Sequence, residues 1–196
     1  TRELAHLFRR YGLELGAMTP DTADTPFGER TSAGKIFGAT GGVMEAAIRT
    51  AYFLLTGQEY PEEKIPAVRG LKGHKEIKLK IGELEIGAAV VSGLGNARKL
   101  LDEIKAGRKD IHFIEVMTCP GGCISGGGQP INTDTEAVKG RLQALYQIDR
   151  DDRVRVSHKN ESIERLYREF LGEPLGKVSH HLLHTHYKKR DIMAKY

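Results

Sequence analysis

Both cysteines of this 196-residue chain lie in one glycine-rich loop, which constrains the fold more than any other feature. The apolar run 112–117 indicates a buried strand and leads directly into Cys119-Pro-Gly-Gly-Cys123, with three more glycines at 126–128. A strand that ends in such a loop presents both thiols at one end of a sheet, so that both can face one bound object. Glycines let the backbone curl around a large inorganic group and offer N–H donors to it. We therefore expect a metal centre here.

The number of cysteines limits which centre the chain can hold. Thiolates are soft ligands that suit iron–sulfur clusters and zinc. A 4Fe-4S cluster takes about four cysteines, and this chain has two, so further ligands must come from other sequence. A zinc site would need tail histidines, which lie more than fifty residues away and in the wrong order for a compact finger. A redox disulfide between Cys119 and Cys123 is the third alternative, although nothing marks the chain as secreted.

The pattern of apolar residues predicts an α/β fold. Alternating residues at 77–81, a Gly82-Glu83 turn and an apolar run at 84–92 predict a hairpin whose second strand is buried on both faces. A helix over 95–105 then connects to a strand over 113–117, and ligands in such folds bind at the carboxyl ends of strands. Helical spacing also predicts helices over 2–11 and 43–55, around 138–146 and around 163–170. We expect a small, mostly parallel sheet flanked by helices, with a helical C-terminal extension.

A second glycine-rich turn, at 38–42, precedes the helix expected over 43–55. Free N–H groups and the helix dipole make such an N-terminus favourable for anions. Glycine-rich turns before helices are common, however, so the turn alone does not establish a site. Glu45 is expected to interact favourably with the dipole and not to be catalytic.

Composition excludes several classes of function. The net charge is +4 and the isoelectric point is near 9.0, but the basic residues are scattered among 26 acidic ones. No basic run with interleaved aromatic residues appears, which argues against nucleic-acid binding, whereas a mild positive bias suits an acidic redox partner such as ferredoxin. No stretch approaches the ~18 apolar residues of a membrane span, and no signal peptide is visible. We expect a soluble, cytoplasmic chain, with the periplasm as the alternative.

Three blocks of the sequence carry a resemblance to one family. The segment from Glu115 to Pro130 resembles the third signature of the iron-only (FeFe) hydrogenases, Glu-x-Met-x-Cys-x-x-Gly-Cys-x-x-Gly-Gly-Gly-x-Pro, at every fixed position. The segment 34–49 resembles the stretch that lies under the metal cluster of that family, and 179–187 resembles the end of its small-subunit segment. The resemblance implies that 1–148 form the C-terminal lobe of the catalytic domain and that 149–196 form a small-subunit-like helical tail packed on it. Two further cysteine signatures of complete members are absent.

The resemblance also implies an activity and a set of site residues. The activity is reversible reduction of protons to dihydrogen at an H-cluster, a 4Fe-4S cubane joined by a cysteine to a diiron unit with carbon monoxide and cyanide ligands. Cys119 would ligate the cubane and Cys123 would bridge it to the diiron unit. The other implied residues line the pocket or shape the loop: Met117, Phe37, Thr40, Gly122, Gly126 and Gly127. The implied partners are the missing N-terminal part of the catalytic domain and ferredoxin or another redox protein.

Less specific interpretations remain beside this one. Taken alone, Met117 and Phe37 would be ordinary core residues, and the tail histidines are expected to pack and hydrogen-bond rather than bind metal. A hydrogenase-like protein for iron–sulfur assembly or sensing is one alternative function, and a non-catalytic interaction subunit is another. By itself, the chain is expected to be inactive, because the other cluster cysteines are missing.

Overall fold

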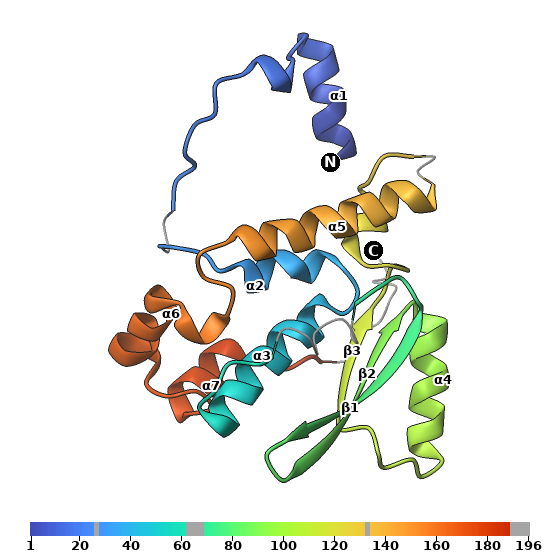
Figure 1. The fold of residues 1–196 in the computed structure, drawn as a ribbon, viewed down its shortest axis with the longest axis vertical. Coiled ribbons are helices and arrows are strands. Elements are labelled where there is room, and N and C mark those ends of the chain that lie inside the picture. The colour runs from blue at the N-terminus through green and yellow to red at the C-terminus, as the bar shows by residue number, and fades with distance from the viewer. Residues whose placement is uncertain (26–27, 62–68, 132–133, 189–196) are drawn as a thin grey trace, which may run out of the picture.

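The computed structural model describes residues 1–25, 28–61, 69–131 and 134–188. A three-stranded sheet lies at its centre, in the order β1 (His74–Ile81), β2 (Leu84–Ser92), β3 (Phe113–Met117) (Figure 1). β1 pairs antiparallel with β2, and β2 pairs parallel with β3. The α/β class is confirmed, but the sheet is mixed rather than mostly parallel. The two-residue turn at Gly82, with a φ of 60°, closes the antiparallel hairpin.

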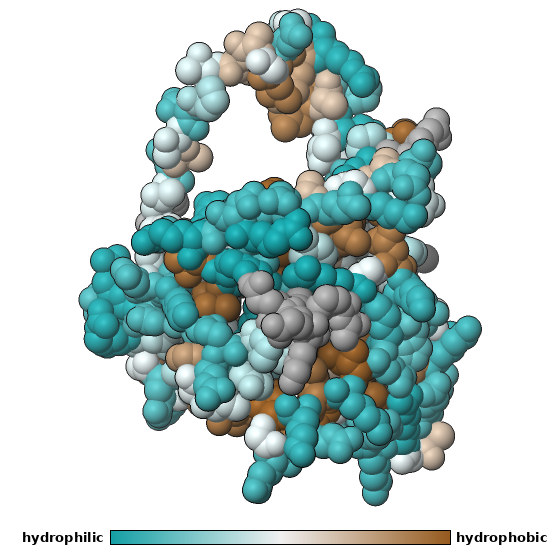
Figure 2. Space-filling model, viewed as in Figure 1, coloured by the Kyte–Doolittle hydropathy of each residue, from teal (hydrophilic) through white to brown (hydrophobic). Residues whose placement is uncertain are grey.

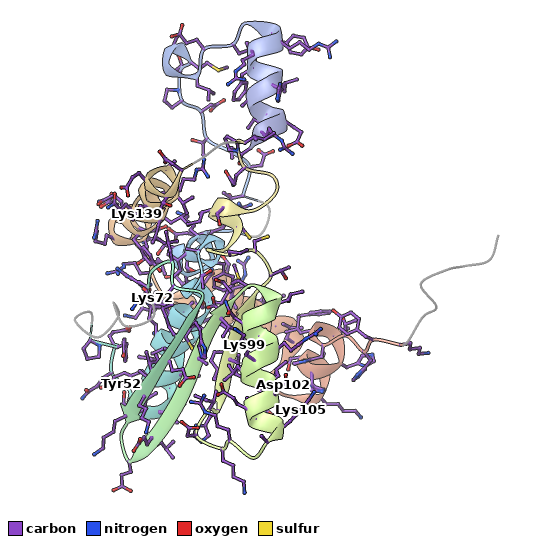
Figure 3. The ribbon with its side chains drawn as sticks, turned by 90° about the vertical axis from the view of Figure 1, so that its right-hand side faces the viewer. Tyr52, Lys72, Lys99, Asp102, Lys105 and Lys139 are labelled. Atoms are coloured by element: carbon purple, nitrogen blue, oxygen red, sulfur yellow. The ribbon has the colours of Figure 1, made fainter. Side chains whose placement is uncertain are left out.

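Helices cover both faces of the sheet. α3 (Gly42–Thr56) packs on one face and α4 (Leu94–Lys105) on the other. The α3 side of the core contains Met44, Ile48, Leu79, Ile81, Ala88 and Val90, and the α4 side contains Ala89, Val91, Ala97 and Leu100. Figure 3 shows α4 over its face of the sheet, with exposed Lys99, Asp102 and Lys105 along it. β2 is therefore the central strand, and its residues 87–92 are buried on both faces as predicted.

β3 is less buried than its sequence indicated. Only Glu115 is buried, whereas Phe113 and Val116 are 43% and 47% exposed. The expectation of a buried strand was wrong. In the described part of the sheet β3 is an edge strand with one neighbour, β2, so one side of it is left uncovered. Helices α3 and α4 thus shield β2 more completely than they shield β3.

The remaining helices surround this centre, whereas α1 lies away from the sheet and its Arg2 N–H donates to the Gly128 carbonyl at 3.0 Å. α1 (Arg2–Tyr11) buries none of its residues and lies at the end of an extended arm, with apolar side chains visible on its surface (Figures 1 and 2). The others are α2 (Ser32–Lys35), α5 (Thr135–Asp151), α6 (Glu161–Leu166) and α7 (Lys177–Leu183), with 3-10 turns η1 (Leu15–Ala17), η2 (Ile36–Gly38), η4 (Cys123–Ser125) and η5 (Ser157–Lys159) and a π-helical segment η6 (Tyr167–Leu171). The helices expected over 2–11, 43–55, 95–105, 138–146 and 163–170 are all present. None of the described helices has the length and apolar character needed to cross a membrane.

A buried network of charges joins α3 to α2 and α5. The Arg49 guanidinium donates to both carboxylate oxygens of Asp149, at 3.0 and 2.7 Å, and to Glu45. The Ser32 hydroxyl donates to Asp149 at 2.6 Å, and Arg69 donates twice to Glu45 at 2.9 Å. Glu45, expected to interact with the helix dipole, is 2% exposed and belongs to this network of ion pairs.

Candidate metal centre

The two thiols lie on the loop that follows β3. Cys119 is half-buried, Cys123 is exposed at the first position of η4, and neither forms a disulfide. The redox-disulfide alternative therefore finds no support in this structure. Gly121 and Gly122, between the cysteines, have φ values of 83° and 92°, which are favourable only for glycine. These residues let the chain reverse direction between the thiols.

The loop packs backbone against backbone on the turn that carries Thr40. The Thr40 N–H donates to the Gly121 carbonyl at 3.2 Å. A Cβ at Gly122 would lie 2.8 Å from the Thr40 nitrogen and 2.9 Å from the Gly38 carbonyl oxygen. Glycine at 122 is therefore required by close approach as well as by φ. The 38–42 turn and the cysteine loop, which are far apart in sequence, form one unit.

Side chains of α5 and β2, and one side chain of the loop itself, hold the loop in place. Arg141 of α5 donates to the Ile124 carbonyl at 2.8 Å, and the Gln129 amide donates to the Cys123 carbonyl at 3.2 Å. Ser92, at the end of β2, accepts a long 3.4 Å hydrogen bond from the Gly121 N–H. Arg141 and Ser92 could not be identified from the sequence, because isolated polar residues far from a motif carry no signal of contact with it.

Several glycine N–H groups that were expected to face a bound group have other partners. The Gly122 N–H donates to the Cys119 carbonyl at 3.0 Å and the Gly126 N–H to the Cys123 carbonyl at 3.1 Å, while that of Gly121 points to Ser92. For these three glycines the expectation was wrong, because the tight loop uses their N–H groups for its own turns. These glycines instead allow the backbone conformation of the loop and its close packing.

The surroundings of the thiols fit a group held by sulfur. A Cβ at Gly126 would lie 3.5 Å from the Cys119 sulfur, so glycine there leaves space beside the thiol. The Thr40 hydroxyl is buried, and no hydrogen-bond partner for it occurs among the described residues. A buried hydroxyl of this kind calls for a polar neighbour. Among the described residues, a Cβ at Gly127 would meet nothing within 4 Å, so no described neighbour requires glycine there.

Glu115 is a fixed position of the third signature whose role the sequence does not indicate. Its carboxylate is 5% exposed and accepts hydrogen bonds from the N–H groups of Gly41, at 2.6 Å, and Met44, at 2.7 Å. These groups belong to the first turn of α3, which the sequence marked as favourable for an anion. The anion that it binds in this structure is Glu115. The signal that could have identified this residue is a carboxylate within an otherwise apolar strand.

Two expected pocket residues lie at the margins of the site. Met117 is half-buried at the end of β3, directly before the loop. Phe37, in η2, is 44% exposed and lines a hollow of about 460 Å³ whose other walls come from 28–35 and 157–163. The structure thus brings Thr40, Gly122 and Gly126 together with the cysteines, and places Phe37 toward a different hollow.

The tail histidines do not complete a metal site. Within the described ranges, no three His, Cys, Asp or Glu side chains gather in a way that could hold a metal ion. His180 and His184 stack on each other instead, with ring centroids 4.3 Å apart. This contact agrees with the expected packing role, and the zinc alternative is left without a ligand set in the part of the chain that the structure describes.

Comparison with known proteins identifies the family. Residues 1–127 match the model of the iron-only hydrogenase large subunit, C-terminal domain, and residues 135–190 match that of the iron hydrogenase small subunit. The chain belongs to the iron-only hydrogenase family. It is 50% identical over 192 residues to the NADP-reducing hydrogenase subunit HndD of Solidesulfovibrio fructosivorans, a match that covers 97% of this chain and 33% of that protein.

Solved structures of the family share the fold. A variant of the FeFe hydrogenase HydA1 from Chlamydomonas reinhardtii superposes with a TM-score of 0.74 at 39% identity, over 94% of this chain and 53% of that one. The family also has relatives of another kind: cytosolic iron-sulfur assembly component 3 of Mus musculus is 32% identical over 193 residues, which is 95% of this chain and 40% of that protein. The chain thus spans a third to a half of the proteins that it matches.

Proposed function

We propose that this chain is part of an FeFe hydrogenase that catalyses the reversible reduction of protons to dihydrogen. The observation that carries the proposal is a pair of free thiols on a loop with the complete third signature, in a chain that matches the C-terminal domain of the hydrogenase large subunit. The loop packs on the Thr40 turn, and the missing side chain at Gly126 leaves a methyl-sized space beside the Cys119 sulfur, which suits ligation by that sulfur.

The cofactor that we propose is the H-cluster. Cys119 would ligate its cubane, and Cys123, the more exposed thiol, would bridge the cubane to the diiron unit. When bound, such a cluster supplies iron centres that exchange low-potential electrons and interconvert protons and dihydrogen. The protein contributes two thiolates, and the hydrogen bonds of Arg141 and Gln129 to the loop fix their backbone.

The pocket residues would control access of water to the cluster. We assign the Met117 thioether to this apolar lining, and the Thr40 hydroxyl to a polar contact, because that hydroxyl is buried beside the loop. The Phe37 ring, which the resemblance also assigns to the lining, lines a different hollow in this structure. Gly122, Gly126 and Gly127 would keep the loop free of side chains. The buried carboxylates Glu45 and Asp149 are engaged in ion pairs with Arg49, and we propose that the catalytic acid and base lie in the rest of the large subunit.

The proposal requires partners. Two thiolates are too few for a cubane, so the rest of the large subunit would supply the remaining ligands. Ferredoxin or another redox protein would exchange electrons with the cluster. We keep the division into a lobe, 1–148, and a small-subunit-like tail, 149–196, as part of the proposal, together with a cytoplasmic location and the periplasm as its alternative.

Substitution of each cysteine in the complete enzyme tests the assignment. Cys123→Ser is expected to abolish dihydrogen turnover, because a hydroxyl is a harder and poorer bridge between iron units than a thiolate. Cys119→Ser is expected to weaken binding of the cubane, which electron paramagnetic resonance reports. Thr118→Ser, at an exposed position next to Cys119, is the matched control and should retain both signals. Equal turnover in Cys123→Ser and wild type would refute the site.

The assembly-factor relatives define the second candidate function. Their likeness over 95% of this chain means that the fold alone does not distinguish the two. In the complete protein, dihydrogen turnover together with infrared bands of carbon monoxide and cyanide ligands would favour the hydrogenase. A cluster without these bands and without turnover would favour iron–sulfur assembly or sensing.

A further inference from the structure

Glu115 occupies an unusual position for a carboxylate. β3 alternates its side chains between two faces, and Glu115 shares with Phe113 and Met117 the face toward α3. An ionised group in such a core is costly unless hydrogen bonds replace its hydration. Here each carboxylate oxygen accepts one short bond, from the N–H groups of Gly41 and Met44, and the positive end of the α3 dipole adds to the stabilisation.

The two donors of these bonds belong to the start of α3, so Glu115 acts as the cap of that helix. Gly41 is the N-cap of α3 and has a φ of 94°, so it has no side chain of its own with which to cap the helix. A strand residue 74 positions away supplies the cap instead. The carboxylate therefore connects β3, which leads into the cysteine loop, with the turn on which that loop rests.

The Glu115 side chain thereby completes a ring of contacts that includes β3, the cysteine loop and the turn before α3. From Glu115 the chain runs through Met117 to the loop, the loop contacts Thr40 through the Gly121 carbonyl, and Thr40 directly precedes Gly41. Gly42 is equally confined, since a Cβ there would lie 1.8 Å from the Ile36 carbonyl oxygen. A shift of the turn relative to β3 would break a bond of Glu115, and a shift of the loop relative to the turn would break the contact between Thr40 and Gly121.

We propose that Glu115 is a positioning residue for the two thiols: by clamping the first turn of α3 to β3, it fixes the cysteine loop in one arrangement before any cluster binds. This inference rests on the proposed function only in treating Cys119 and Cys123 as ligands. The expected consequence is a difference between the two thiols in the metal-free chain, with Cys119 half-buried and slow to react and Cys123 exposed and fast.

The test uses the metal-free chain and the substitution Glu115→Gln. The amide keeps one acceptor oxygen but presents its NH2 group to a backbone N–H, so one bond of the clamp is lost. Amide hydrogen exchange at 41–44 should then accelerate about tenfold, as expected when a bond to a charged acceptor is lost. Alkylation of Cys119 by iodoacetamide should also accelerate about tenfold, toward the rate of Cys123. Glu85→Gln, at an exposed site of β2, is the matched control and should change neither rate.

The two rates together separate a helix-capping role of Glu115 from a role in positioning the thiols. Faster exchange at 41–44 with unchanged alkylation of Cys119 would show that Glu115 is only a helix cap, and would overturn the proposal. If Glu115→Gln does not melt cooperatively, Glu115→Asp, which keeps the charge but is too short to reach both donors, should give intermediate rates. Loss of cooperative melting in both variants would assign Glu115 a purely structural role. The exchange and alkylation rates are measured on the metal-free chain, so they do not depend on cluster binding. Failure of the complete protein to bind a cluster would therefore refute the proposed function without deciding the role of Glu115.

Discussion

At the scale of single residues, the glycines of the cysteine loop have unequal roles although the motif treats them alike. Gly122 has a positive φ, and a Cβ there would clash with the Thr40 backbone, whereas a Cβ at Gly127 would meet none of the described residues within 4 Å. The sequence does not reveal this difference, because the φ of each glycine and the approach of the 38–40 backbone to position 122 exist only in the folded chain. The structure therefore separates a glycine needed for folding from one whose role would depend on a bound group or partner.

Alanine substitutions at the two glycines should separate these roles. Gly122→Ala combines an unfavourable φ with a backbone clash, and we expect it to lower the free energy of unfolding by about 2 kcal/mol. Gly127→Ala, its control, should change this free energy by less than about 0.5 kcal/mol. Urea denaturation of the 196-residue chain followed by circular dichroism measures both. Equal losses at the two positions would contradict the close packing of the loop on the Thr40 turn.

At the scale of elements, the sequence predicted most of the helices and strands but not their surroundings. The hairpin, α4 and β3 followed from alternation, helical spacing and the Gly82 turn. The burial of β3 did not, because an apolar run does not reveal that the strand has one neighbour. The capping of α3 by Glu115 and the pairing of Arg49 with Asp149 span 71 to 100 positions, and no local pattern encodes such contacts.

The ion pairs between α3 and α5 should make stability depend on acid. Burial raises the pKa of Asp149, but hydrogen bonds from Arg49 and Ser32 outweigh it and lower the pKa to about 2. Since the folded-state pKa lies below the ordinary value of 3.8, the carboxylate stabilises the fold above pH 4. This stabilisation, worth about 2 kcal/mol, is lost as the pH falls from about 4 to 2.

Asp149→Asn should remove this contribution. The variant leaves Arg49 with an incomplete set of acceptors, so we expect the free energy of unfolding at pH 7 to fall by about 3 kcal/mol. Between pH 4 and pH 2 its stability should also depend less on pH than that of wild type. Asp102→Asn, at an exposed position on α4, is the control. Urea midpoints at several pH values measure both effects, and parallel pH profiles for Asp149→Asn and wild type would contradict the assigned pKa.

At the scale of the whole molecule, the decisive quantity is the number of thiolates. The chain provides two, both in one loop, and the described residues contain no third or fourth ligand grouped with them. It spans about half the length of the solved family structures and a third of HndD. Cluster binding is therefore a property that we assign to the chain together with the rest of the large subunit.

Anaerobic reconstitution with iron and sulfide tests this assignment. The isolated monomer should hold no stable 4Fe-4S cluster, because two of about four thiolates are absent. Addition of the remaining large-subunit sequence should produce a reducible cluster in absorption and paramagnetic resonance spectra. The double variant Cys119→Ser, Cys123→Ser gives the background of adventitious iron, and size-exclusion chromatography separates monomer from dimer, since two chains together could supply four thiolates. A stoichiometric, reducible 4Fe-4S signal in the monomer fraction would refute the requirement for a partner, because a ligand set complete within this chain would then have to exist.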